Sequence, residues 1–226
     1  MKRHVVAVML ACAASCTASM AAEPPPAPEY RILRDVVYHG GEVPLKPGPG
    51  WLALAVVGGR WHLLPASLQG EPAHDGVVDG SDDKTGVRLR AAPAHAFLYL
   101  RLPGLTPGKV DTPDVRFKDR ARPMDDSTAL ALTFNARPWR LDVRQHEIFV
   151  TDGSTTMSFG NATGTDDGAP DSVALLWAGD LDRDGRLDFI FEGSGNNDCT
   201  LCVWLSSRAT AGQLVGRAAC WRTTGC

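Results

Sequence analysis

The sequence predicts an all-β protein, with an antiparallel sandwich or barrel-like architecture. Its apolar segments are short, about four to eight residues each, and they are rich in Val, Leu, Phe and Trp. Clusters of Gly, Pro and Asp separate these segments, as expected for tight turns between strands. Helical periodicity, with apolar residues three and four apart, is nearly absent. Together these observations favour antiparallel sheets over a helical or mixed fold.

Apolar runs of strand length continue along the chain to the C-terminal cysteines. Strands are expected at 30–39, 51–57, 60–64, 86–90, 96–102, 128–135, 139–144, 147–152, 155–159, 172–178, 187–192, 201–206 and 213–221. Gly58-Gly59 lies between two of these runs and has the composition of a two-residue hairpin turn. Asn135-Ala-Arg-Pro138 and Asp152-Gly153 are turn signals of the same kind.

Two stretches, 71–84 and 103–126, have the composition of loops. If the second is a linker, it divides the chain near residue 115 into two halves. A single continuous sandwich or barrel with a long loop is the alternative. We therefore expect an all-β domain over 30–226, with the subdivision near 115 left open.

The first 21 residues have the organisation of a signal peptide. A short positive region, Met1-Lys-Arg-His4, precedes an apolar run at 5–14 that is too short to span a bilayer. Small residues in Ser19-Met-Ala21 match a cleavage site. Residues 22–29 form a proline-rich spacer that cannot continue a helix. A periplasmic or secreted location follows from this prediction.

A lipid anchor is the alternative at this end of the chain. Cys12 and Cys16 follow small residues, as in a lipoprotein cleavage box, but neither has Leu three residues earlier. No later segment approaches the roughly eighteen apolar residues that a transmembrane helix needs. Removal of Lys2 and Arg3 takes the formal charge from −3 to −5. Such a mildly acidic chain lacks the clustered positive face that nucleic acid requires. The partner is expected to be a protein or a glycan.

The cysteines of the mature chain are crowded at its C-terminal end: Cys199, Cys202, Cys220 and Cys226. An even number of cysteines in an oxidising compartment predicts two disulfides, with three possible pairings. A zinc site is the first alternative, but the second pair lacks the CxxC spacing of a zinc knuckle. A redox CxxC motif is the other, but such motifs open a helix, and the sequence here favours a strand.

The most specific motif in the chain is Asp180-Leu-Asp-Arg-Asp-Gly-Arg-Leu-Asp188. Its positions 1, 3, 5 and 9 are aspartates, and Gly185 occupies position 6, where the backbone must turn sharply. Calcium takes about six to eight oxygen ligands, which alternate acids can supply as the backbone wraps the ion. Four carboxylates crowded into this loop would repel one another without a divalent ion between them. The spacing predicts a calcium site; a solvated Asp-Gly turn is the alternative.

The motif differs from an EF-hand, which needs a bidentate Glu at position 12, where this chain has Phe191. The segment Trp177-Ala-Gly-Asp-Leu-Asp-Arg-Asp-Gly-Arg-Leu-Asp-Phe-Ile-Phe191 resembles the calcium loops of FG-GAP or VCBS-like repeats, found in integrin α-chain propellers and many secreted bacterial proteins. The resemblance implies a loop over 177–192 with these ligands: Asp180, Asp182, Asp184, the carbonyl of Arg186, and Asp188. The chain contains one such loop and is too short for a propeller. Its C-terminal segment also resembles the ending of exported proteobacterial proteins, which implies no activity.

The sequence contains no pattern typical of a catalytic site. The histidines after residue 21 form no HxH or HExxH pair, and no GxSxG motif occurs. His74 beside Asp75 is the best catalytic candidate, although an acidic loop with one histidine is usually a solvated surface. The tryptophans at 51, 61, 139, 177, 204 and 221 could line a carbohydrate platform, but tryptophans in strands are more often core residues.

The functional expectation is a binding or adhesion-type module in which calcium is structural. A calcium-dependent hydrolase acting on glycans or lipids, with the acidic loop at 74–83 near the ion, is the first alternative. An envelope protein whose aspartate loop binds no ion is the second.

Overall fold

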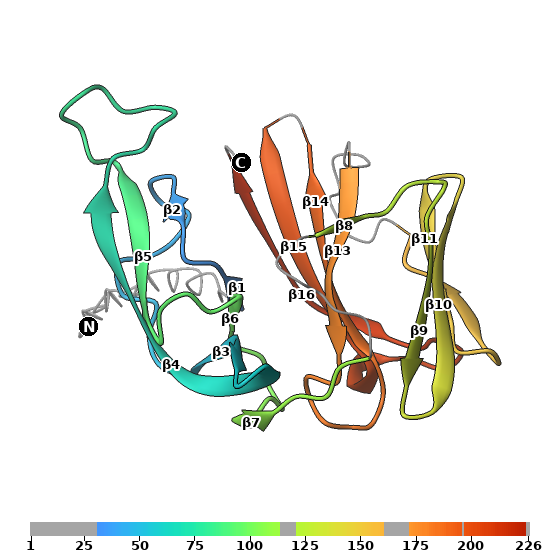
Figure 1. The fold of residues 1–226 in the computed structure, drawn as a ribbon. Coiled ribbons are helices and arrows are strands. Elements are labelled where there is room, and N and C mark those ends of the chain that lie inside the picture. Colours follow the sequence, from blue (N-terminus) through green and yellow to red (C-terminus); the bar gives the residue numbers. More distant parts are fainter. Residues whose placement is uncertain (1–30, 114–120, 161–171, 196, 225–226) are drawn as a thin grey trace, which may run out of the picture.

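The computed structural model describes residues 31–113, 121–160, 172–195 and 197–224. It confirms the all-β class, because its strands form three antiparallel sheets (Figure 1). The only helical element among the described residues is a single 3-10 turn, η1 (Ser206–Arg208). The predicted signal peptide at 1–21 and the spacer at 22–29 lie outside the described residues.

The first sheet has the strand order β1-β6-β3-β4-β5-β2, and a short strand, β7, also pairs with β4. Its strands are β1 (Ile32–Leu33), β2 (Val37–Tyr38), β3 (Trp51–Val57), β4 (Arg60–Ala73), β5 (Gly86–Ala92), β6 (Leu98–Leu100) and β7 (Gly108–Lys109). The predicted strand at 30–39 is divided, because β1 pairs with β6 whereas β2 pairs with β5. The predicted hairpin turn is confirmed, since Gly58 and Gly59 both have positive φ.

β4 continues well beyond its predicted end at residue 64. Pro65 directly follows that predicted end, and proline cannot donate to a strand ladder. In the structure, β4 pairs with β3 as far as Ala66 and with β5 from Ser67 onward. The change of partner curls the sheet around a small core of its own. The buried members of that core are Leu33, Tyr38, Val43, Trp51, Ala53, Leu89 and Tyr99.

The second half of the chain forms the other two sheets. A four-stranded sheet, β12-β11-β10-β9, contains β9 (Ala129–Phe134), β10 (Arg137–Arg144), β11 (Glu147–Thr151) and β12 (Thr156–Ser158). A five-stranded sheet, β16-β15-β14-β13-β8, contains β8 (Arg122–Pro123), β13 (Ser172–Gly179), β14 (Asp188–Ser194), β15 (Asp198–Leu205) and β16 (Gly216–Thr224). The strands β7 and β8 lie within the predicted loop at 103–126 and were not predicted, because two residues carry no recognisable strand pattern.

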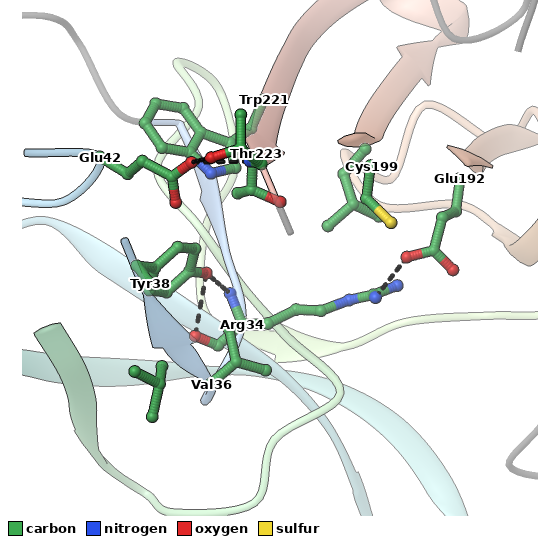
Figure 2. A pocket seen from close by; sticks show the side chains of 11 residues that line it. Arg34, Val36, Tyr38, Glu42, Glu192, Cys199, Trp221 and Thr223 are labelled. Carbon is green, nitrogen blue, oxygen red and sulfur yellow. Dashed lines mark hydrogen bonds and ion pairs between the residues drawn. The ribbon is translucent and has the colours of Figure 1, made fainter. Parts of the chain in front are cut away.

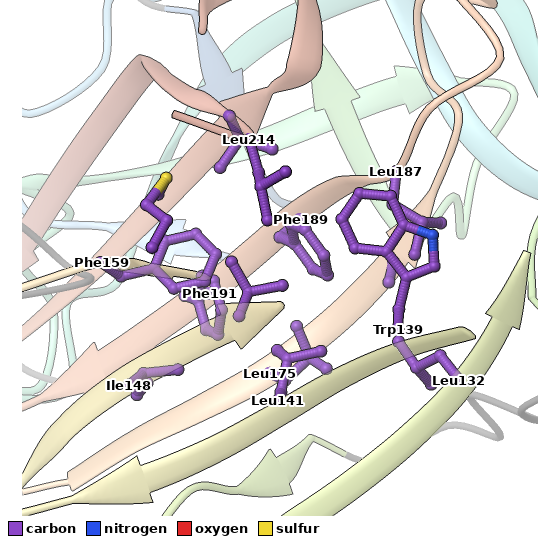
Figure 3. Close-up of a cluster of buried hydrophobic side chains, with 14 of the residues drawn as sticks. Leu132, Trp139, Leu141, Ile148, Phe159, Leu175, Leu187, Phe189, Phe191 and Leu214 are labelled. Atoms are coloured by element: carbon purple, nitrogen blue, oxygen red, sulfur yellow. The ribbon is translucent and has the colours of Figure 1, made fainter. Parts of the chain in front are cut away.

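The five-stranded sheet is the middle layer of the molecule (Figure 1). On β14, Phe189 and Phe191 pack toward the four-stranded sheet (Figure 3), whereas Ile190 packs toward the first sheet. Successive side chains of a strand point to opposite faces, so a sheet buried on both faces has consecutive apolar residues. This explains the uninterrupted Phe-Ile-Phe run. A β-bulge between Leu175 and Trp177 likewise distributes β13 over both cores.

The first sheet ends before the predicted boundary near residue 115, and the other two sheets follow it. The boundary itself falls on 114–120, outside the described residues. One core spans both halves, since Leu54 and Leu63 of the first sheet pack with Ile190 and Val203 of the middle sheet. In the part of the chain that the structure describes, no helix has the length and apolar character needed to cross a bilayer.

A disulfide joins Cys202 to Cys220, which are directly opposite on β15 and β16. This bond confirms part of the cysteine prediction, and it leaves too few thiolates for the four-cysteine zinc alternative. Cys199 is also disulfide-bonded. Cys226 lies outside the described residues.

Candidate metal site

The aspartate motif forms the loop between β13 and β14, which we call the metal loop (residues 180–188). Pairing of Gly179 with Asp188 closes its base. Gly185 has a φ of +83°, as expected for a sharp turn at position 6 of the motif. Gly179 permits a close backbone approach, because a Cβ there would lie 2.7 Å from the carbonyl oxygen of Asp111. The sharp turn and the close backbone approach therefore explain why glycine occupies these two positions.

Three carboxylates of the metal loop converge. Oxygen atoms of Asp180, Asp182 and Asp188 lie within 4.8 Å of one another. Asp180 is 6% exposed and Asp188 is 0% exposed, so neither is screened by bulk water. This cluster of three acids could hold a metal ion.

Backbone N–H groups fix the two buried carboxylates in place. Asp180 accepts hydrogen bonds from the N–H groups of Asp184 and Gly185, each at 3.0 Å. Asp188 accepts them from Leu181 and Ser206, each at 2.7 Å. An ionised carboxylate has about four lone-pair sites, so each group keeps capacity for a cation. The carboxylates are therefore positioned by the fold itself.

Burial and neighbouring carboxylates raise the pKa values of the two buried aspartates. Burial, followed by the charge of Asp182, raises the pKa of Asp188 well above its usual value. Burial, followed by the charges of Asp184 and Asp182, also raises the pKa of Asp180, although hydrogen bonds from Gly185 and Asp184 oppose the shift. Oδ1 of Asp182 is buried and has no hydrogen-bond partner, while its Oδ2 accepts from the hydroxyl of Ser207. A buried acceptor without a partner is costly, and a cation would satisfy it.

The structure brings together the carboxylates of three of the four predicted aspartate ligands. The carboxylate of Asp184 is outside the cluster, where it accepts from the N–H of Arg186 at 2.9 Å and from the hydroxyl of Ser206 at 2.7 Å. The side chains of the loop arginines point elsewhere. Arg183 donates to the carbonyl of Thr106, and Arg186 donates to the carbonyl of Leu214 at 3.0 Å.

The metal loop also contacts segments from both halves of the chain. The N–H of Asp180 donates to the carbonyl of Asp111 at 2.9 Å, just beyond the first sheet. The side-chain amide of Asn135, in the β9–β10 turn, donates to the carbonyl of Gly185 at 2.9 Å. Sequence reasoning missed Asn135, Ser206 and Ser207 because only the tertiary fold brings them to the loop. The loop lies at a junction of all three layers.

The other acidic loop, at 74–85 between β4 and β5, is here called the arm loop. It lies at the opposite end of the molecule from the metal loop (Figure 1), so the two loops do not meet as the hydrolase alternative required. Nδ1 of His74 lies 3.2 Å from the carbonyl oxygen of Asp83. The buried carboxylate of Asp75 bonds with His39 and not with its neighbour His74.

The tryptophans belong to the cores of the three layers. Trp51, Trp139 and Trp177 are buried, and each belongs to a different hydrophobic cluster. Trp61, Trp204 and Trp221 pack against these clusters while partly buried. They form no common platform, which agrees with the structural interpretation of tryptophans in strands.

No protein-family model matches the chain, and neither curated proteins nor solved structures give a match.

Proposed function

We propose that this chain is an exported β protein in which calcium, held by the metal loop, stabilises the junction of the three sheets. The observation that carries the proposal is the cluster of Asp180, Asp182 and Asp188, with a buried oxygen of Asp182 that has no hydrogen-bond partner. On this proposal the ion neutralises carboxylates that would otherwise repel one another. The protein itself serves as a binding module for a protein or glycan outside the cytoplasm.

The donor set supports calcium over a transition metal. All atoms of the cluster are carboxylate oxygens, which suit hard cations, whereas zinc and copper sites favour nitrogen and sulfur ligands. Calcium accepts an irregular set of oxygens, while magnesium demands a nearly ideal octahedron. The resemblance to FG-GAP loops adds Asp184 and the carbonyl of Arg186 to the proposed ligands. The three clustered aspartates contribute most of the binding free energy, because Asp184 is held by Ser206 and Arg186.

Export is supported by two independent features. The N-terminal 21 residues have the pattern of a signal peptide. The disulfide between Cys202 and Cys220 is of a kind that persists in oxidising compartments. Extracellular calcium modules are often weak, with dissociation constants of about 10⁻⁴ to 10⁻³ M, which suits a compartment with abundant calcium.

A thermal titration tests the calcium proposal. The purified mature protein is stripped with EDTA and melted at increasing calcium concentrations. At about 10 mM calcium the melting temperature should rise by about 3 to 10 °C, given that affinity range. Magnesium at the same concentration should give a smaller shift, and metal analysis should find about one calcium ion for each chain. An unchanged melting temperature at millimolar calcium would exclude a structural calcium ion.

A further inference from the structure

A cavity of about 240 Å³ lies between the first sheet and the middle sheet (Figure 2). Arg34 and Tyr38 line it from the β1–β2 segment, and Glu192 and Trp221 line it from β14 and β16. Its volume is just below the range of about 300 to 1,000 Å³ that is typical for drug-sized ligands. The cavity therefore suits a ligand of one six-membered ring.

The wall formed by the middle sheet presents an acid and an aromatic ring on one face. Glu192 is directly opposite Leu201, and Leu201 is directly opposite Trp221. Direct cross-strand neighbours project from the same face of a sheet. The backbones of the two residues are therefore two strand spacings apart, roughly 10 Å. Both residues line the cavity.

The polar end of the cavity is an ion pair between Nη1 of Arg34 and Oε1 of Glu192. Their side chains are 31% and 19% exposed, so the pair is accessible without being fully solvated. A guanidinium has five N–H donors and a carboxylate has two acceptor oxygens, so the pair offers further donors beside a further acceptor. Two neighbouring hydroxyl groups of a sugar match this arrangement, because one accepts from Arg34 while the other donates to Glu192.

Two further polar groups of the lining, Glu42 and Tyr38, already have hydrogen-bond partners within the protein. Glu42 accepts from the N–H and the hydroxyl of Thr224, both at 2.7 Å, and from the N–H of His39 at 3.1 Å. The Tyr38 hydroxyl donates to the carbonyl of Arg34 at 3.1 Å. Glu192 already balances the charge of Arg34, and Glu42 adds a second carboxylate, so the cavity offers an anion no uncompensated positive group. An anionic ligand is therefore disfavoured, and a neutral polar ligand is compatible with the Arg34–Glu192 pair.

We propose that this cavity binds the pyranose ring of a neutral sugar. Neighbouring hydroxyls bond to the Arg34–Glu192 pair, and the apolar face of the ring packs on the indole of Trp221. Aromatic side chains combine a flat apolar surface with defined geometry, which suits such packing. The proposal is separate from the calcium site, because no residue of the metal loop lines the cavity and β14 runs from that loop toward it (Figure 1).

Saturation-transfer difference NMR on the full mature protein in calcium tests this proposal. The probes are the methyl glycosides of glucose, galactose, mannose and N-acetylglucosamine, each at up to about 50 mM, since single-ring ligands bind weakly. At least one should receive saturation on its ring protons, with a dissociation constant of about 1 to 10 mM and a change in tryptophan fluorescence. The Arg34→Lys variant keeps the charge opposite Glu192 but loses the planar fork, so its affinity should fall at least about tenfold.

The matched control is Arg90→Lys, in the exposed Arg90–Glu71 pair on the first sheet. It changes the same chemistry outside the cavity and should leave the affinity unchanged. Equal affinity in Arg34→Lys and the native protein, with both folded by circular dichroism, would overturn the proposal. Absence of transfer to all four glycosides would overturn it as well, and so would binding of benzoate or choline without any binding of a sugar.

Discussion

The metal loop and the arm loop are both acidic loops that connect antiparallel strands. Their carboxylates differ in the donors that hold them and in whether they converge on one another. In the arm loop, Asp79 accepts from the N–H groups of Asp75 at 2.8 Å and Thr85 at 2.9 Å, and also from the hydroxyl of Thr85. Asp75 accepts from Val77 and pairs with His39. In the metal loop, oxygen atoms of three carboxylates converge on one another.

The pKa directions express the same contrast. The hydrogen bond from His39 lowers the pKa of Asp75. Burial alone would raise the pKa of Asp79, but the hydrogen bonds from Asp75 and Thr85 together lower it. Burial raises the pKa values of Asp180 and Asp188, and neighbouring aspartates reinforce the shift. The carboxylates of the arm loop are thus held by separate donors, whereas those of the metal loop converge on one another, and one oxygen of Asp182 has no hydrogen-bond partner.

The largest effect should come from Asp188→Ala. It removes a buried acceptor of two backbone N–H groups and leaves both unsatisfied, so unfolding should become easier by about 3 kcal/mol. The calcium-dependent rise in melting temperature should vanish. Asp83→Ala in the arm loop removes an exposed carboxylate and should change stability by less than about 0.5 kcal/mol. Urea denaturation measures both; a retained calcium response in Asp188→Ala would contradict the proposed ligand set.

Two isosteric substitutions, one in each loop, should change stability in opposite directions. Without calcium, Asp182→Asn should stabilise the protein by about 1 kcal/mol, because it removes a charge that repels both Asp180 and Asp188. The same variant should lose the calcium response. Asp79→Asn should instead destabilise the protein, since the hydrogen bonds that lower the pKa of Asp79 favour a charged carboxylate over a neutral amide. Thermal melts of the two variants, each in EDTA and in calcium, give four melting temperatures to compare with those of the native protein. If both variants shift the melting temperature in EDTA in the same direction, the contrast between the loops is refuted.

A smaller effect should follow from Asn135→Gly. Glycine tolerates the positive φ of this turn residue but removes the amide that donates to Gly185. We expect a loss of about 1 kcal/mol and a calcium affinity about fivefold weaker. Gln145→Gly is the matched control, because Gln145 has a similar positive φ in the β10–β11 turn. Isothermal titration should separate the two variants, and equal affinities would show that the Asn135 contact does not support the site.

The smallest effect should be a pH dependence at the arm loop. The hydrogen bond to Asp75 raises the pKa of His39, so the stabilisation from protonated His39 is fully present below pH 6.5 and is lost as the pH rises through its raised pKa. The pKa of Asp75 is lowered, so its stabilisation is present above pH 3.8 and is lost as the pH falls through the lowered value. The pair therefore contributes most between pH 3.8 and 6.5.

His39→Gln should remove the decline of stability above pH 6.5. The change should amount to less than about 3 °C in melting temperature, since the pair is partly exposed. Melting curves at pH 6 and pH 8 for the native and variant proteins measure it. An identical pH dependence in both proteins would show that His39 is not the titrating group.

Local pattern predicted much of the fold. The strand at 51–57 and the Gly58-Gly59 turn were predicted at the positions where the structure has them, because a short apolar run and turn chemistry are local signals. The extension of β4 past Pro65 was missed, because it depends on a change of partner from β3 to β5. The stacking of one sheet on each face of the middle sheet was also not predicted. Which sheets stack is a tertiary property that adjacent sequence does not encode.

The candidate metal site was predicted in position but only partly in composition. The spacing of Asp180, Asp182 and Asp188 was sufficient to predict that their carboxylates converge, because the ends of a closed hairpin loop meet. The separate placement of Asp184 was not predictable, since it depends on the hydroxyl of Ser206, far along the chain. The His39–Asp75 pair was missed for the same reason. Because His74 is next to Asp75 in the sequence, these two residues were considered together, whereas in the fold Asp75 pairs with His39 from another segment.

The middle sheet has a consequence for how the protein unfolds. The first sheet and the four-stranded sheet each bury apolar side chains against one face of that sheet, so neither outer layer has another cover for those side chains. Loss of β13 and β14 would expose both cores at the same time. Unfolding should therefore be a single cooperative transition with no surviving half, and calorimetric and van't Hoff enthalpies should agree. An ion bound between β13 and β14 would then act on the stability of all three layers together.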